Sequence, residues 1–233
     1  GKTTVAKILG SKLRELGVLS KGHVVVRERA TLIGKYYSSE SENTLAAIEE
    51  AEGGILFIDE AYQLCQPDDP KDPGRFVIET LMTALADESK RDWMLILAGY
   101  TEPMQRLFDI NPGLRSRIPQ SNIFTFEDFN GPELMEIAEG YLRRNHFTLD
   151  EQARHRLCRR LSADYANRDA DFGNARHVIN LITTSIIPAV ASRVSQLSDP
   201  DKEQLTTILP ADIPADVPQP TYLRAYRRIG FAV

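Results

Sequence analysis

The sequence has little cysteine and little histidine, with two and four copies among 233 residues. Cys65 and Cys158 lie far apart, and no histidine or cysteine has the spacing of a zinc site. We therefore expect reduced thiols, with neither a disulfide framework nor structural zinc. Reduced thiols are typical of proteins inside the cell, so we predict a cytoplasmic location.

Long apolar runs and an excess of positive charge are also missing. No stretch has the pattern of a membrane span or a secretory leader, so we expect neither. Acidic residues outnumber basic ones by 33 to 28, and the formal net charge of −5 argues against general nucleic-acid binding. The apolar and charged fractions, 42% and 26%, are those of an ordinary globular protein. The length suits one sizeable domain, or a medium domain and a small one.

The most informative stretch is residues 53–60, GGILFIDE, where four large apolar residues lead directly into two carboxylates. An uninterrupted apolar run of this length suits a strand that is buried on both faces of a parallel sheet. Such strands end at the carboxyl edge of the sheet, where ligands bind. Taken alone, the stretch also fits a core strand followed by an acidic helix start.

Apolar segments recur along the first half of the chain and predict its fold class. Strand-like runs lie at residues 23–26, 55–58, 94–98 and 123–126, with amphipathic helical segments between them. This alternation predicts an α/β core with a parallel sheet over residues 1–129. From residue 130 the pattern is helical only, which predicts a small all-helical subdomain over residues 130–198.

The last part of the chain differs in composition from both. Residues 199–220 are rich in Asp and Pro and predict an extended linker. The tail that follows, to residue 233, alternates arginines with aromatic residues. It is interpreted as a docking segment, and the alternative is a contact with nucleic acid or anionic lipid.

The first four residues, Gly1-Lys2-Thr3-Thr4, match the second half of the phosphate-binding motif G-x-x-x-x-G-K-[ST] and open a helix. Backbone N–H groups at a helix start bind anions. In this motif Lys2 would neutralise the β- and γ-phosphates, and the Thr3 hydroxyl would bind Mg²⁺. The tetrapeptide alone also fits an ordinary basic helix cap. Because the first half of the motif and the strand before it are not present, we expect a sheet that misses its first strand, and weak binding of ATP.

The carboxylates after the 55–58 run complete this interpretation. Asp59 would hold Mg²⁺ together with Thr3, and Glu60 would polarise the attacking water as a general base. A Gly-Lys-Thr start combined with a buried strand that ends in Asp-Glu is far more specific than either part. The combination predicts a nucleoside triphosphatase that uses ATP and Mg²⁺.

With these motifs in place, the sequence resembles the AAA+ ATPases, and among them the CbbX/CfxQ-like group, which includes relatives of the stage V sporulation protein K. The resemblance covers about residues 1–190. It rests on GKTT at the start, LIGKY at 32–36, GGILFIDEAY at 53–62, ILAGY at 96–100, NPGLRSRI at 111–118 and GNAR at 173–176. It implies a Rossmann-like P-loop core, a helical lid and a homo-oligomeric ring, which we expect to be a hexamer.

The resemblance also implies roles for four further residues. Thr101 stands where many AAA+ proteins have a polar sensor-1 residue. Arg117, with Arg115 close behind, resembles the arginine finger that reaches the γ-phosphate in a neighbouring subunit. Arg176 resembles the sensor-2 arginine of the lid. The alternatives are a solvated turn for Arg115 and Arg117 and an exposed helix start for Arg176.

In the family, an aromatic residue in the loop after the second strand lines a central pore and grips substrate polypeptide. The corresponding residues are Lys35, Tyr36 and Tyr37, although the usual aromatic-aliphatic-Gly run is replaced by Tyr-Tyr-Ser. An aromatic ring can hold arbitrary side chains by packing alone. The alternative is an ordinary surface pair of tyrosines.

These predictions together indicate an ATP-driven motor that remodels a protein client. An ATP-gated scaffold or switch that assembles without threading a client fits the same motifs. No residue indicates which client or pathway the protein serves.

Overall fold

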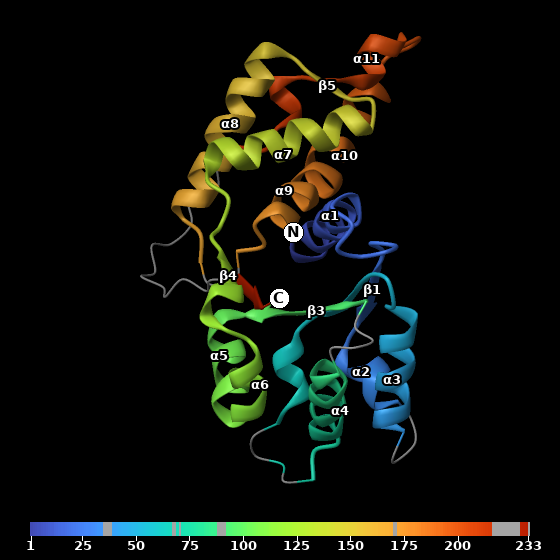
Figure 1. Ribbon diagram of the computed structural model, residues 1–233. Helices are drawn as coiled ribbons and strands as arrows, with labels where there is room; N and C mark the ends of the chain where they lie inside the picture. The colour runs from blue at the N-terminus through green and yellow to red at the C-terminus, as the bar shows by residue number, and fades with distance from the viewer. Residues whose placement is uncertain are drawn as a thin grey trace. The chain divides into compact units, whose positions relative to one another are not determined.

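The computed structural model of the chain describes residues 1–34, 39–66, 69, 71–87, 92–169, 172–215 and 229–232. The chain forms two compact units (Figure 1). One comprises Gly1–Glu127 with Arg227–Val233, and the other comprises Asp128–Tyr226. Each unit has a hydrophobic core of its own.

The first unit is built on a five-stranded sheet with the order β1-β2-β3-β7-β4. Its strands are β1 (Val24–Arg27), β2 (Ile55–Ile58), β3 (Met94–Tyr100), β4 (Ile123–Phe126) and β7 (Ile229–Ala232). Strands β1, β2 and β3 pair in parallel. β4 runs in the same direction as β3, because both are antiparallel to β7. The predicted α/β class, with four strands at the expected places, is confirmed.

β7 was not expected from the sequence, which assigned its residues to a tail. It lies between β3 and β4 and pairs with both, from Leu97 to Tyr100 on one side and from Ile123 to Phe126 on the other. Figure 1 shows it in red beside these strands. A strand between β3 and β4 hydrogen-bonds the backbone N–H and C=O groups along one edge of each, which favours insertion of a strand there. The sequence predicted a sheet that misses its first strand, and in the structure an antiparallel strand, β7, lies between β3 and β4.

Helices cover both faces of this sheet, and the alternation of side chains along β2 explains how. Ile55 and Phe57 pack in the cluster that contains Ala6 of α1, whereas Leu56 and Ile58 pack in the larger cluster beneath the other helices. The helices are α1 (Lys2–Glu15), α2 (Arg29–Ile33), α3 (Glu40–Glu50), α4 (Gly74–Ala86), α5 (Thr101–Ile110) and α6 (Pro112–Arg117), with short turns η1 (Ala61–Leu64) and η3 (Gln120–Asn122). α1 lies on the opposite face from α3 and α4 (Figure 1).

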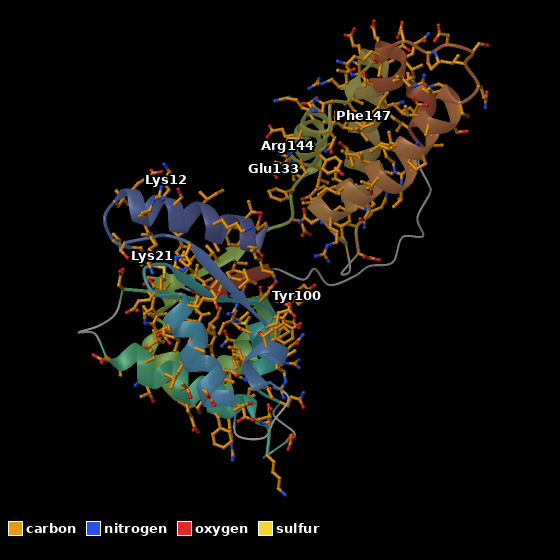
Figure 2. All side chains as sticks on the ribbon, turned by 90° about the vertical axis from the view of Figure 1, so that its right-hand side faces the viewer. Lys12, Lys21, Tyr100, Glu133, Arg144 and Phe147 are labelled. Carbon is orange, nitrogen blue, oxygen red and sulfur yellow. The ribbon has the colours of Figure 1, made fainter. Side chains whose placement is uncertain are left out.

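The second unit is helical, as expected. Its elements are α7 (Gly131–Arg144), α8 (Glu151–Ala166), α9 (Ala175–Leu181), the π-turn η4 (Ile182–Ile186), α10 (Ile187–Val194) and α11 (Lys202–Thr206), with a small parallel pair β5 (Thr148–Leu149) and β6 (Thr207–Ile208) and a turn η5 (Pro210–Asp212). Glu133 and Arg144, both labelled in Figure 2, lie in the first and the last turn of α7. Glu133 completes a capping box with Asn130, which defines the start of that helix.

Residues 199–213 differ from the extended linker that their Asp- and Pro-rich composition predicted. They form α11, β6 and η5, and Ile208 and Ile213 are almost fully buried in the core of the helical unit. Asp212 is also buried and forms an ion pair with Arg193. The composition misled because an aspartate that is paired inside the fold and one in a solvated linker look the same in the sequence.

Helical structure continues from Ala175 to Val194 even though this segment contains Pro188, a residue type that commonly breaks or kinks a helix. The π-turn η4 lies immediately before it, and a wider turn accommodates a residue that lacks an N–H and crowds the preceding carbonyl. Among the described residues, the helical segment Ala175–Val194 is long and apolar enough to cross a membrane, judged by length and composition alone. Its apolar residues Val178, Ile182 and Ile186 are fully buried in the unit's core.

Candidate active site

Three charged residues from distant parts of the sequence meet at the carboxyl edge of the sheet. Lys2 begins α1, whereas Asp59 and Glu60 directly follow β2. The Lys2 ammonium lies 2.8 Å from Glu60 Oε1 and 3.2 Å from Asp59 Oδ1. All three side chains are partly buried, at 16%, 29% and 30% exposure. The structure thus brings together the lysine and the two carboxylates that the sequence singled out.

Glu60 has two unusual features. Its backbone lies in the left-handed region, with φ 49° and ψ 43°, which non-glycine residues rarely adopt. Its Oε2 atom is buried and has no hydrogen-bond partner among the described residues, whereas Oε1 accepts from Lys2. A buried carboxylate oxygen without a partner is costly, and such atoms concentrate at sites that a ligand completes.

The electrostatics of this cluster favour a charged lysine. Burial opposes protonation of Lys2, but the hydrogen bond to Glu60 and the charges of Asp59 and Glu60 outweigh it and raise the pKa of Lys2. Burial and the neighbouring Glu60 carboxylate both raise the pKa of Tyr62, so that this phenol stays protonated. The site therefore offers a permanent cation between two carboxylates.

Two tyrosines beside this cluster were not identified from the sequence. The Lys2 ammonium lies 5.5 Å from the ring centroid of Tyr100, labelled in Figure 2, and the rings of Tyr62 and Tyr100 are 6.3 Å apart. A ring face attracts a cation and excludes water from one side of it. The signal for Tyr100 was its place at the end of a predicted buried strand. Tyr62 had the weaker signal of lying two residues after Glu60.

The remaining residues of the phosphate-loop motif lie at the same helix start. Gly1 is the N-cap of α1, and its carbonyl accepts from the N–H of Val5. Thr3 is partly buried and Thr4 is exposed on the first turn. Thr101 is the first residue of α5, directly after Tyr100, and is partly buried. The proposed sensor-1 residue therefore follows the strand next to β2 in the sheet.

Arg115 and Arg117 lie in the last turn of α6, and both are exposed. Arg115 donates to Gln120 Oε1 at 3.2 Å, and Arg117 donates to the carbonyl of Gly113 at 3.0 Å. Arg117 also lines a cavity of about 250 Å³ with Trp93 and Ile118. Their described hydrogen bonds stay within their own segment, so the structure does not bring these arginines to Lys2.

The other predicted residues divide into two groups. Arg176 lies in α9 of the helical unit, where its backbone N–H donates to the carbonyl of Gly173 at 2.9 Å. Lys35, Tyr36 and Tyr37 lie outside the described residues.

Two family models match the chain. Residues 1–126 match the family described as "ATPase family associated with various cellular activities (AAA)", and residues 130–221 match the AAA lid domain. The chain belongs to the AAA ATPase family. This confirms the family resemblance inferred from the motifs.

Several relatives of this AAA ATPase are similar over most of the chain. It is 38% identical to the stage V sporulation protein K of Bacillus subtilis over 91% of the chain and 65% of that protein. It is 35% identical to the protein CbbX of Cereibacter sphaeroides over 92% of the chain and 68% of that protein. The chain thus spans about two thirds of the length of these curated relatives.

Solved structures share the fold of this AAA ATPase at lower identity. The structure of a mutant RuvB from Thermotoga maritima matches with a TM-score of 0.56 at 19% sequence identity, over 91% of the chain and 56% of that structure. At this identity the likeness concerns the fold alone. It supports an α/β core followed by a helical lid.

The donor set at the sheet edge fits Mg²⁺ and a nucleotide phosphate. Thr3 and Asp59 carry hydroxyl and carboxylate oxygens, the donor types that Mg²⁺ prefers, and Lys2 carries a cation that matches a phosphate. Within the described ranges, no group of three His, Cys, Asp or Glu side chains comes close enough to hold a metal. Mg²⁺ in such sites is bound by one or two protein ligands together with substrate phosphates and water.

Proposed function

We propose that this AAA protein hydrolyses ATP at the carboxyl edge of its sheet. The observation that carries the proposal is the Lys2 ammonium, shared between Glu60 Oε1 at 2.8 Å and Asp59 Oδ1 at 3.2 Å. Beside it lies Glu60 Oε2, which is buried and has no hydrogen-bond partner in the described part of the chain. This arrangement is costly to leave without a ligand and is suited to a phosphate and a water molecule.

The charges of the cluster suggest how each residue acts. Lys2 would exchange its carboxylate partners for the oxygens of the β- and γ-phosphates. Glu60, released from Lys2, would then accept the proton of the attacking water. Asp59 and Thr3 would hold Mg²⁺, which neutralises phosphate charge when bound. Gly1 and Thr4 would offer backbone N–H groups at the helix start, and Thr101 would orient the water.

We further propose that full turnover needs a homo-oligomeric ring, which we expect to be a hexamer. Arg115 and Arg117 have their described hydrogen bonds within their own segment, at Gln120 and Gly113, and both are exposed. Exposed guanidinium groups of this kind are available to the γ-phosphate bound by a neighbouring subunit. Arg176 of the lid would contact the nucleotide of its own subunit.

Replacement of Arg117 by alanine tests the ring. We expect turnover to fall about 10³–10⁵-fold, because the finger stabilises charge on the transferring phosphoryl group, while the affinity for ATP stays near that of the parent. Arg144→Ala, an exposed arginine at the end of α7, is the matched control and should leave turnover unchanged. Full turnover by Arg117→Ala would overturn the interface proposal.

For the client, we propose a protein segment gripped in a pore by Tyr36, with Lys35 and Tyr37 beside it. The alternative is an ATP-gated scaffold that threads nothing. The discriminating experiment compares Tyr36→Ala with Tyr36→Phe, using an unstructured polypeptide as the probe. Threading predicts that the polypeptide stimulates ATP hydrolysis in the parent and in Tyr36→Phe but not in Tyr36→Ala. Equal stimulation in all three would favour the scaffold.

A further inference from the structure

Asn174, the residue before α9, has a backbone conformation that side chains rarely allow. Its φ of 53° and ψ of −124° lie in a region that is open mainly to glycine. Among the described non-glycine residues with positive φ are Glu60, which belongs to the candidate active site, and His146. A conformation of this kind persists only where the surrounding contacts hold it in place, so the contacts of Asn174 indicate what it does.

Both ends of the Asn174 amide are used on one short segment. Its Nδ2 donates to Asp128 Oδ1 at 2.8 Å, and its Oδ1 accepts from the backbone N–H of Phe129 at 3.2 Å. Asp128 and Phe129 are the first two residues of the helical unit, where the chain arrives from the α/β unit. The amide therefore ties the start of α9 to the point at which the chain enters this unit.

Asp128 is held in turn by the segment that ends α8. Arg168 Nε donates to Asp128 Oδ2 at 3.1 Å, and both side chains are largely buried, at 15% and 19% exposure. The Arg168 guanidinium also donates to the carbonyl of Tyr165 at 2.7 Å and lies 3.8 Å from the centroid of its ring. Three segments, the entering chain, the end of α8 and the start of α9, thus meet through Asp128.

Arg176 follows Asn174 by two residues, and its N–H closes the turn onto the carbonyl of Gly173. We propose that Asn174 is a positioning residue: its amide, held by Asp128 and Phe129, sets the direction in which α9 presents Arg176. The inference rests on the proposed role of Arg176 in binding nucleotide. It assigns to Asn174 an effect on turnover through Arg176, without contact with the nucleotide.

The first test is Asn174→Gly in the full chain, because glycine keeps the backbone conformation and removes only the amide. Asn145→Gly is the matched control, since the Asn145 side-chain amide also donates one hydrogen bond, to the carbonyl of Tyr141 at the end of α7. We expect hydrogen exchange at the amides of residues 176–178 to rise about tenfold in Asn174→Gly and not in the control. ATP turnover should fall about tenfold, while the thermal midpoint stays within the range of the control.

A second test exchanges the hydrogen-bond donor and acceptor between Asn174 and Asp128, and it applies even if Asn174→Gly folds poorly. Asn174→Asp places a carboxylate against Asp128 and should lower turnover further. In the double variant Asp128→Asn with Asn174→Asp, the new amide can donate to the new carboxylate. Recovery of turnover to within about threefold of the parent is expected. A double variant that is no better than Asn174→Asp would contradict the specific pairing.

A third experiment, in an Arg176→Ala background, distinguishes a failure of this inference from a failure of the proposed function. If Asn174 acts through Arg176, then Asn174→Gly should cause no further loss in an Arg176→Ala background. A full additional loss there would overturn the inference. If Arg176→Ala alone leaves turnover intact, the role of Arg176 fails, and the exchange rates at 176–178 still decide whether Asn174 positions α9. Unchanged exchange in both Asn174→Gly and Asn174→Asp would overturn the inference.

Discussion

Two carboxylate sites, one in each compact unit, differ in how far their oxygens are hydrogen-bonded. In the α/β unit, Glu60 and Asp59 share one lysine, and Glu60 Oε2 has no partner among the described residues. In the helical unit, Asp212 accepts from Arg193 at 2.9–3.2 Å and from the N–H of Leu209 at 2.8 Å. The second arrangement is complete in itself, whereas the first leaves capacity for a ligand.

Asp72 shows that the difference depends on position and does not follow the unit. It belongs to the α/β unit and is 3% exposed, yet it accepts from Arg29 at 2.6 Å and from the N–H groups of Gln66 and Gly74 at 2.6 and 3.0 Å. A buried carboxylate with its oxygens satisfied supports the fold. A carboxylate at the carboxyl edge of the sheet with an oxygen to spare is placed for chemistry.

Of the variants that test this comparison, Glu60→Gln is expected to have the largest effect, which is a loss of ATP turnover. An amide cannot accept the proton of water, so we expect turnover to fall about 10²–10⁴-fold while ATP is still bound. The free energy of unfolding should change by less than about 1 kcal/mol, because Lys2 keeps Asp59 as a partner. Steady-state hydrolysis, nucleotide titration and urea unfolding measure the three quantities. Glu52→Gln, an exposed glutamate, is the control; turnover equal to that control would refute the assignment of Glu60.

Asp212→Ala should give the opposite pattern. Removal of this carboxylate leaves the half-buried Arg193 guanidinium without its charge partner, and we expect a loss of about 3 kcal/mol in the free energy of unfolding. Asp199→Ala, an exposed aspartate before α11, should change it by less than about 0.5 kcal/mol. Urea unfolding followed by circular dichroism measures both. Equal stabilities of the two variants would mean that this ion pair contributes little to the fold.

The smallest expected effect is that of pH on the stability of the folded chain. Burial would raise the pKa of Asp72, but the Arg29 guanidinium and the N–H groups of Gly74 and Gln66 outweigh it and lower that pKa. His177 and Arg160 likewise outweigh burial and lower the pKa of Asp164. A lowered pKa in the folded chain contributes stability that is present above the unfolded value of about 4 and is lost as the pH falls below it.

Unfolding measured between about pH 3 and 6 tests this expectation. The parent should lose stability towards the acid end, and Asp72→Asn, which cannot titrate, should have the shallower slope. Parallel slopes for the two chains would show that the Asp72 carboxylate has the same pKa in the folded and unfolded states.

The sheet and half of the site could be predicted from the sequence. The apolar run 55–58 predicted a strand that is buried on both faces and ends at Ile58. Asp59 and Glu60 were therefore expected at the carboxyl end of that strand. Lys2 and Glu60 lie 58 positions apart in the chain. That they serve one site was predicted from the two phosphate-site motifs taken together. The insertion of β7 between β3 and β4 was not predicted, because a local side-chain pattern does not say which distant segments of the chain pair with one another.

The sequence by itself determined the local chemistry: an apolar run that ends in two acids, and a helix that starts with a lysine. Tertiary structure alone decided which charges are satisfied. Asp212 lies in a segment whose composition predicts a linker, yet it is buried and paired with Arg193. Glu60 Oε2 is buried and has no hydrogen-bond partner within the described ranges. Asn174, whose backbone has a positive φ, hydrogen-bonds Asp128 and Phe129, 46 and 45 positions away in the chain. Burial and pairing depend on neighbours that are distant in the chain, and no local pattern encodes them.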